Sequence, residues 1–109
     1  MIGIKMKLLV QPEMRDRLLS VVRGMLSAIR QTRGCVSCQF YENIENENSF
    51  TLVEEWKSQQ DMESHLYSDA FVTFLVMMFE LLEPPDIQLF KNSQATGPAV
   101  AATALDVCL

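Results

Sequence analysis

One histidine and a pair of cysteines are the side chains of this 109-residue chain that most readily do chemistry. His65 is the only histidine, and histidine is the residue whose unperturbed pKa lies nearest neutrality. It lies in the segment Met62-Glu-Ser-His-Leu-Tyr67 and could accept or donate a proton near neutral pH. From the residues alone, we interpret it as a structural histidine that anchors a short helix to a sheet.

The cysteines of Cys35-Val-Ser-Cys38 have the C-x-x-C spacing of thiol redox pairs. Such a pair needs its first thiol at a helix N-terminus, where the helix dipole lowers the thiol pKa, whereas this motif opens a predicted strand. Residues three apart on a strand point to opposite faces, so neither a disulfide nor a shared metal is expected. No second C-x-x-C is present for zinc, and Cys108 is interpreted as a free thiol. We therefore expect no metal site.

Charge and hydropathy exclude several classes of protein. The net charge is −5, from 9 basic and 14 acidic residues, which argues against nucleic acid and against anionic membrane surfaces as partners. The longest apolar stretch, residues 71–79 with Thr73 inside it, is far shorter than the ~20 residues that span a bilayer. The first residues lack the long apolar run of a signal peptide, so we expect a cytoplasmic protein with reduced thiols.

Two hydrophobic patterns predict the first half of the domain. Apolar residues recur at every second position in Ile2, Ile4, Met6, Leu8 and Val10. This period of two is typical of a strand with one buried face. Spacings of three and four then predict an amphipathic helix at about 13–32, and Gly34 is expected to stop it.

The next segment predicts an antiparallel hairpin, with strands at 35–43 and 50–57 joined by a polar turn at 45–49. A capping box then starts a short helix at Ser58. An apolar helix at 70–82 and a short strand at 87–90 complete the pattern.

This order of elements predicts an α+β fold, the ferredoxin-like split βαβ arrangement with an antiparallel sheet and helices on one face. We expect one domain at 1–91 and a tail at 92–109 that is flexible or docked on a subunit. The opposite face of the sheet, with Leu9, Tyr41 and Val53, needs a cover. A second copy of the chain is the simplest one, so we expect a homodimer.

Residues 2–91 resemble the antibiotic biosynthesis monooxygenase family. The resemblance is carried by Gly34-Cys35, the turn at 45–49, Phe50-Thr-Leu-Val-Glu-Glu-Trp56 and His65-Leu-Tyr-Ser-Asp-Ala-Phe71. It implies a dimeric α+β barrel with a pocket between helices and sheet. Some members oxidise polycyclic phenols or quinols with molecular oxygen and use no metal or flavin. Haem degradation is not expected, because Leu75 stands where that branch of the family has an iron-ligating histidine.

The resemblance also implies roles for individual side chains. His65 becomes a candidate proton acceptor for an acidic phenol, a role that we weigh equally with the structural one. Trp56, Phe71 and Phe74 become candidate pocket walls for a small aromatic or quinone-like molecule, although ordinary core packing would also suit them. Tyr41 could bond a substrate oxygen, but we expect it to face the dimer interface or solvent.

Glu54 shares its predicted strand face with Leu52 and Trp56, where a carboxylate is costly unless it is paired. We expect it to pair with His65 or with an arginine of the first helix, and a structural ion pair, within the chain or across a dimer, is the role that we favour.

The preferred hypothesis is a cofactor-independent monooxygenase that oxidises a small phenolic or quinol compound. Two alternatives stay open, because one fold hosts many functions. One is a non-enzymatic dimeric module that binds or senses a small ligand. The other is a non-oxidative isomerase on the same scaffold.

Overall fold

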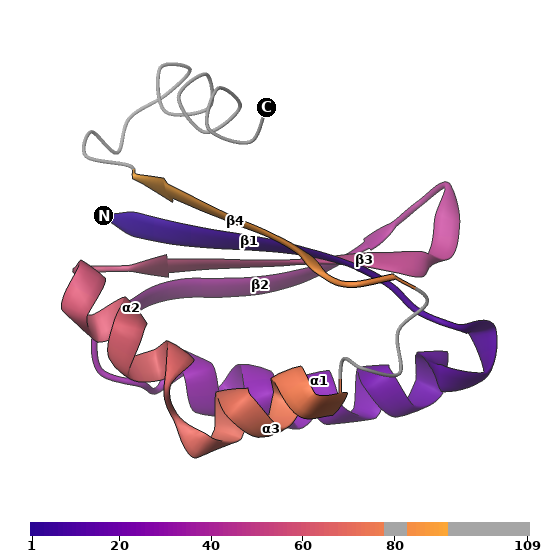
Figure 1. Ribbon diagram of the computed structural model, residues 1–109, viewed down its shortest axis with the longest axis horizontal. Helices are drawn as coiled ribbons and strands as arrows, with labels where there is room; N and C mark the ends of the chain where they lie inside the picture. Colours follow the sequence, from indigo (N-terminus) through magenta and orange to yellow (C-terminus); the bar gives the residue numbers. More distant parts are fainter. Residues whose placement is uncertain (78–82, 92–109) are drawn as a thin grey trace.

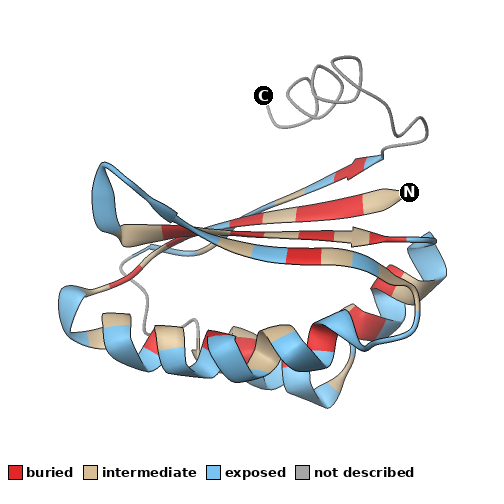
Figure 2. Ribbon diagram, turned by 180° about the vertical axis from the view of Figure 1, so that it is seen from behind, coloured by how far each residue is buried: buried red, intermediate tan, exposed pale blue. Residues whose placement is uncertain are grey.

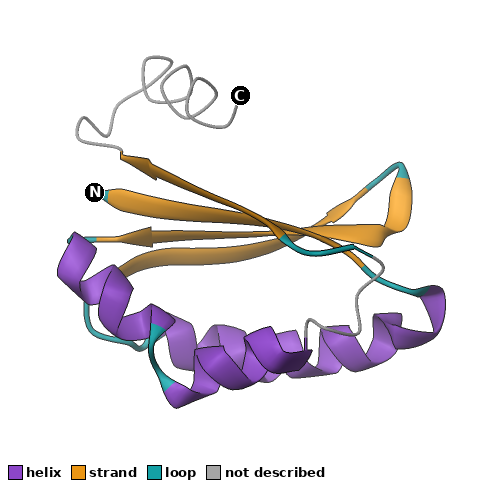
Figure 3. Ribbon diagram, in the orientation of Figure 1, coloured by secondary structure: helices purple, strands orange, loops and turns teal. Residues whose placement is uncertain are grey.

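The chain folds as four antiparallel strands with helices on one face of the sheet (Figure 1, Figure 3). The computed structural model describes residues 1–77 and 83–91. The elements run in the order β1 (Ile2–Leu9), η1 (Pro12–Met14), α1 (Arg15–Arg30), β2 (Cys35–Asn43), β3 (Asn46–Trp56), α2 (Gln59–Leu66), α3 (Asp69–Met77) and β4 (Asp86–Lys91). This confirms the predicted α+β, ferredoxin-like fold.

The sheet has the strand order β2-β3-β1-β4, so the first strand lies in the middle. The strand faces predicted from the period-two patterns are the buried ones, and they pack against the helices. The fully buried side chains on these faces are Ile4, Met6 and Leu8 of β1 and Phe50, Leu52, Glu54 and Trp56 of β3. Helix α1 adds Leu18, Val22 and Ile29 to this core. Figure 2 shows the buried side of the helices turned toward the sheet and the exposed side turned away.

The β2–β3 hairpin is longer than predicted, because β3 begins at Asn46 and only residues 44–45 form the turn. Asn43 Oδ1 accepts a hydrogen bond from the Glu45 amide at 2.9 Å, which stabilises this tight turn. The hairpin end carries polar residues on both faces. It therefore has no hydrophobic alternation from which a strand could be predicted.

A β-bulge at Val36 makes one prediction wrong. Cys35 lies opposite Trp56 and Cys38 lies opposite Glu54, with a register shift between Cys35 and Ser37. Directly opposed residues on antiparallel strands share a face, so both cysteines lie on the helix-covered face rather than on opposite faces. Val36 takes the extra position in the strand and is 45% exposed.

Helices α1 and α2 begin and end close to the predicted residues, and α3 begins close to its predicted first residue. Gly34 has a φ of 87°, a left-handed conformation that suits glycine after the end of α1. The apolar helix predicted at 70–82 is observed as α3 from Asp69 to Met77. Its predicted last turns at 78–82, and the predicted tail at 92–109, lie outside the described residues. Within 1–77 and 83–91, no helix is long and apolar enough to cross a membrane.

Candidate functional site

His65 is held on the inner face of α2. The helix begins where the Ser58 hydroxyl accepts a hydrogen bond from the Asp61 amide at 3.1 Å. Met62 and His65, three residues apart, are the buried residues of this helix and share its inner face. His65 is only 4% exposed, so its imidazole points into the protein.

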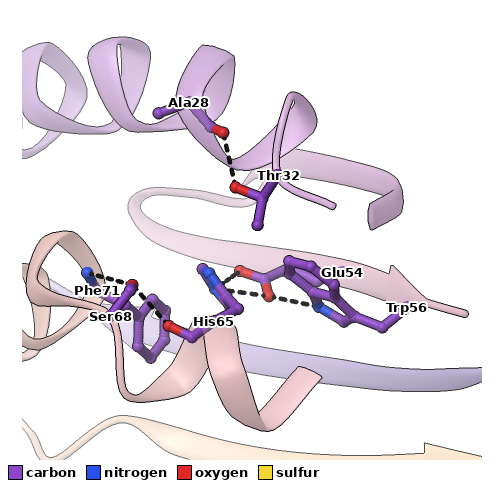
Figure 4. A network of polar contacts seen from close by, with 7 residues as sticks. All are labelled: Ala28, Thr32, Glu54, Trp56, His65, Ser68 and Phe71. Carbon is purple, nitrogen blue, oxygen red and sulfur yellow. Dashed lines mark hydrogen bonds and ion pairs between the residues drawn. The ribbon is translucent and has the colours of Figure 1, made fainter. Parts of the chain in front are cut away.

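The buried partner of His65 is the carboxylate of Glu54, which is 0% exposed (Figure 4). His65 Nε2 lies 3.1 Å from Glu54 Oε1 and 3.3 Å from Oε2. The indole Nε1 of Trp56 also donates to Glu54 Oε1, at 3.0 Å. Nε2 is thus the ring nitrogen within hydrogen-bond distance of the carboxylate, and in the tautomer that donates from Nε2 the lone pair of the ring lies on Nδ1. The predicted pairing of Glu54 with His65 is therefore present.

Aromatic rings enclose the imidazole on two sides. The Trp56 ring stacks on it with centroids 4.7 Å apart and planes 25° apart, and the Phe71 ring is tilted by 55° at 4.6 Å. Phe74 follows, with its ring 6.0 Å from that of Phe71. The structure thus brings together four of the five candidate site residues, His65, Trp56, Phe71 and Phe74, and adds Glu54 to them. We call His65, Glu54, Trp56, Phe71 and Phe74 the His65 cluster.

The link between α2 and α3 fixes the position of Phe71 against His65. Ser68 Oγ donates to the His65 carbonyl oxygen at 2.7 Å and accepts from the Phe71 amide at 3.3 Å (Figure 4). One hydroxyl therefore ties the helix that carries the imidazole to the helix that carries the phenylalanine rings.

Tyr41 lies away from the His65 cluster. It stands opposite Thr51 on the face of the sheet that the helices do not cover, and it is 55% exposed. This position agrees with the expectation that Tyr41 faces solvent or a second subunit.

The two cysteines on the helix-covered face are poor nucleophiles. Burial, followed by the nearby Glu54 charge, raises the pKa of Cys38 to about 12, and the same two causes raise the pKa of Cys35. The thiols therefore stay protonated near neutral pH, whereas a nucleophile or a metal ligand must be a thiolate. Among the residues that the structure describes, no three His, Cys, Asp or Glu side chains are grouped closely enough to hold a metal ion.

A groove of about 620 Å³ lies beside the cluster, between α2 and the adjoining ends of β1 and β4. It is lined by Ile2, Gln59, Met62, Glu63, Leu66, Tyr67, Leu89, Phe90 and Lys91. The family resemblance implied a pocket between helices and sheet but not these lining residues, because they come from the two ends of the domain and meet only in the folded sheet, where Ile2 pairs with Lys91.

The chain belongs to the antibiotic biosynthesis monooxygenase family, whose sequence model matches residues 1–76. One relative, from Bacillus subtilis, bears the name "Putative monooxygenase YcnE"; it is 29% identical over 85 residues, which cover 78% of this chain and 90% of that protein. Another, "Uncharacterized protein sll1783" of Synechocystis, is 26% identical over 86 residues, and the match spans 78% of this chain but only 58% of that protein.

A solved structure described as a "putative antibiotic biosynthesis monooxygenase" from Deinococcus radiodurans shares the fold. Its TM-score is 0.83 with 19% identity, over 89% of this chain and 97% of that one.

Proposed function

We propose that this protein is a cofactor-independent monooxygenase that oxidises a small phenol or quinol with molecular oxygen. The observation that carries the proposal is the buried Glu54–His65 pair, with Nε2 and Oε1 3.1 Å apart, inside an aromatic cluster. The family match and the monooxygenase name of the Bacillus subtilis relative support the same class of reaction.

The proposed first step is removal of the phenolic proton by His65 Nδ1. Glu54 acts as a positioning residue, because its hydrogen bond keeps the proton on Nε2 and the lone pair on Nδ1. Its negative charge also stabilises the imidazolium that forms. A positioned base of this kind typically contributes about 10²–10⁴-fold to a rate.

The electrons for oxygen activation come from the substrate anion. The phenolate passes one electron to O2, and the resulting phenoxyl radical and superoxide form a carbon–oxygen bond at a ring carbon. The imidazolium returns its proton to the peroxide. The O–O bond of the hydroperoxide then breaks, and its outer hydroxide leaves as water together with the proton of that ring carbon. The balance is one phenol and one O2 to one quinone and one water, so one oxygen atom enters the product.

In this proposal Trp56, Phe71 and Phe74 are the walls of the substrate site. Their rings already surround the imidazole at centroid distances of 4.6–4.7 Å for Trp56 and Phe71. Aromatic rings offer a planar phenol stacking contacts. Because His65 is only 4% exposed, a neighbouring side chain has to move before substrate reaches Nδ1.

The proposed working form is a homodimer joined through the uncovered face of the sheet. Tyr41 is 55% exposed on that face, and the half-buried Leu9 and Val53 lie on it as well. A second sheet packed there would bury this mixed surface. Tyr41 would then contact the second subunit rather than the substrate bound in its own subunit.

A second candidate function is a non-enzymatic module that binds a small aromatic ligand. It is favoured by one observation: the groove beside the cluster is lined by residues other than His65. In that case the Glu54–His65–Trp56 hydrogen bonds serve only to satisfy a buried carboxylate.

Oxygen consumption with a panel of naphthols and quinols separates the two functions. We expect the native protein to consume oxygen, and we expect the rate of consumption to fall by about 10²-fold or more in His65→Gln. Glutamine keeps an N–H donor for Glu54 but has no basic nitrogen. Ser64→Ala, on the exposed side of the same helix, is the matched control and should retain full uptake. Tight binding of a panel compound without any uptake would support the binding module instead.

A further inference from the structure

A row of apolar side chains along β4 is exposed on the helix-covered face of the sheet. Ile87 pairs with Met6 across the sheet, and Leu89 pairs with Ile4. Met6 and Ile4 are each 1% exposed, whereas Ile87 and Leu89 on the same face are 47% and 51% exposed. β4 is an edge strand, so its side chains lie at the border of the helix layer. Exposed apolar side chains that continue a buried face indicate a contact surface.

The groove beside α2 continues this surface. Its volume is about 620 Å³, and its apolar wall is formed by Ile2, Met62, Leu66, Leu89 and Phe90. Leu89 belongs to both, so the exposed row of β4 leads directly into the groove. The charged side chains of the groove are Lys91, at the end of β4, and Glu63, on the wall formed by α2. The groove is therefore a mainly apolar surface with a cation at the point where the chain leaves β4.

The sequence after Lys91 contains an apolar segment that suits this groove. Ser, Gln, Ala, Thr, Gly and Pro dominate residues 92–104, whereas Leu105-Asp-Val-Cys-Leu109 is apolar at every second position. In extended form, such a segment presents Leu105, Val107 and Leu109 on one face. Asp106 is the only charged side chain in 92–109, and its charge is opposite to that of Lys91.

The short stretch 92–104 would keep this segment close to the groove. It starts directly after Lys91, which itself lines the groove. As a flexible coil it would span about 20 Å r.m.s. from end to end, which gives residues 105–109 an effective concentration on the order of 1 mM at the groove. A separate molecule of equal affinity would need that concentration in solution to compete.

We infer that residues 105–109 of the same chain dock in this groove, with Leu105, Val107 and Leu109 against its apolar wall and Asp106 near Lys91. The docked segment closes the groove to other molecules until it leaves. Docking itself does not rest on the proposed function, since it needs no turnover.

The effect of docking on catalysis does rest on the proposed function. Met62 lines the groove and lies one turn before His65 on the same face of α2. The docked segment would therefore lie over the groove side of the His65 cluster and slow any oxidation there.

Cys108 lies within the segment and can report docking by disulfide formation. We compare Glu63→Cys with Ser64→Cys, because both positions are exposed neighbours on α2 but only Glu63 lines the groove. A disulfide needs Cα atoms about 4.4–6.8 Å apart, so with oxidised glutathione the bond to Cys108 should form about tenfold faster in Glu63→Cys. Cys35 and Cys38 compete poorly, because burial raises the pKa of both thiols. Peptide mass spectrometry identifies the bonded pair.

Leu105→Glu tests whether apolar contact holds the segment in place. A carboxylate is disfavoured against an apolar wall, so this change in the Glu63→Cys chain should slow bond formation about tenfold. Ala102→Glu is the matched control, because it adds the same charge within 92–104, and it should slow the reaction less than about twofold.

Four outcomes decide the inference. A faster bond within one chain at Glu63→Cys, slowed by Leu105→Glu, supports it. Equal rates in Glu63→Cys and Ser64→Cys overturn it, as does equal slowing by Leu105→Glu and Ala102→Glu. Bonds mainly between two chains, seen at twice the chain mass on a non-reducing gel, also overturn it and assign the groove to the segment of a second copy.

Oxygen uptake distinguishes this inference from the proposed function. If the segment is docked about half of the time, Leu105→Glu should raise the uptake rate about twofold, and Ala102→Glu should not. An unchanged rate in Leu105→Glu would overturn the closing of the groove. The expected disulfides without oxygen uptake by any of the chains would contradict the oxidation and leave the docking standing.

Discussion

Glu54 is the residue on which the proposed chemistry depends. It is a fully buried carboxylate, and such a charge is tolerated only when it is well hydrogen-bonded. Trp56 Nε1 and His65 Nε2 supply the two donors. Under the proposed function the same contacts set the tautomer of His65, so the stability of the core and the proposed base at Nδ1 depend on one side chain.

Glu54→Gln should reverse the tautomer of His65. The amide oxygen can still accept from Trp56, but the amide nitrogen then faces His65 Nε2 and can only donate. His65 Nε2 lies 3.3 Å from the position of that nitrogen and 3.1 Å from the oxygen, so a donor amide there favours acceptance at Nε2 and a proton on Nδ1. Nitrogen-15 NMR of the single histidine reports this directly. We also expect a loss of about 1–3 kcal/mol in the free energy of unfolding and loss of any oxidation that depends on Nδ1.

Glu55→Gln is the control for this experiment, because Glu55 lies next along β3 on the other face, where it accepts from Ser37 at 3.0 Å. Its spectrum should match that of the native protein. Native spectra with the proton on Nδ1 would contradict the assigned tautomer.

Cys38 should make the protein less stable at alkaline pH. Its pKa is raised from 9.0 to about 12 in the folded state, first by burial and then by Glu54. Between these pH values the folded chain binds more protons than the unfolded chain, so the free energy of unfolding falls as pH rises, by up to about 1.4 kcal/mol per pH unit. Urea unfolding of Cys38→Ala should show a weaker decline in the free energy of unfolding with pH than the native chain does. Parallel declines in the two proteins would refute this cause.

At the scale of elements, the α2–α3 junction positions the site. α2 brings His65 to the sheet, and α3 brings Phe71 against the imidazole. The hydroxyl of Ser68 satisfies a carbonyl at the end of one helix and an amide at the start of the next.

Ser68→Ala should therefore lower the free energy of unfolding by about 1 kcal/mol, the usual loss when a helix cap is removed. The loss is measured by urea unfolding, followed through Trp56 fluorescence. Ser64 is an exposed serine within α2 that makes neither cap, so Ser64→Ala should leave the free energy of unfolding nearly unchanged. Equal midpoints for the two variants would show that the junction hydrogen bonds add nothing.

The elements that the sequence predicts well are those with one clearly buried face. The alternation from Ile2 to Val10 and from Phe50 to Trp56 predicted both the strands and their inner faces, including that of Glu54. The bulge at Val36 could not be predicted, because it depends on how β2 pairs with β3 and leaves no mark in the pattern. The pairing of His65 with Glu54 was one of several options, since a predicted element does not fix which side chains meet.

At the scale of the whole molecule, the described helices all lie on one face of the sheet and leave its other face uncovered (Figure 1). Val53 lies near the middle of the open face, on one of the two central strands. The half-buried and exposed side chains around it are those that a second copy would cover under the proposed homodimer.

Val53→Glu should convert the proposed dimer into a monomer, because a carboxylate buried in that interface would lack a partner. Sedimentation at micromolar concentration should give twice the chain mass of 12.4 kDa for the native protein and 12.4 kDa for the variant. Val76→Glu makes the same change at an exposed position of α3 and should leave the dimer intact. A native protein that sediments as a monomer would contradict the proposed assembly.

The central claim is that His65 accepts the proton that starts a reaction between a phenol and O2. Its most direct test supplies oxygen-18 gas to metal-free protein with a naphthol substrate and follows labelled quinone by mass spectrometry. We expect one labelled atom per quinone from the native chain, and a rate lower by about 10²-fold or more in His65→Gln. Labelled quinone forming equally fast in both proteins, or no labelled quinone from the native chain, would contradict it.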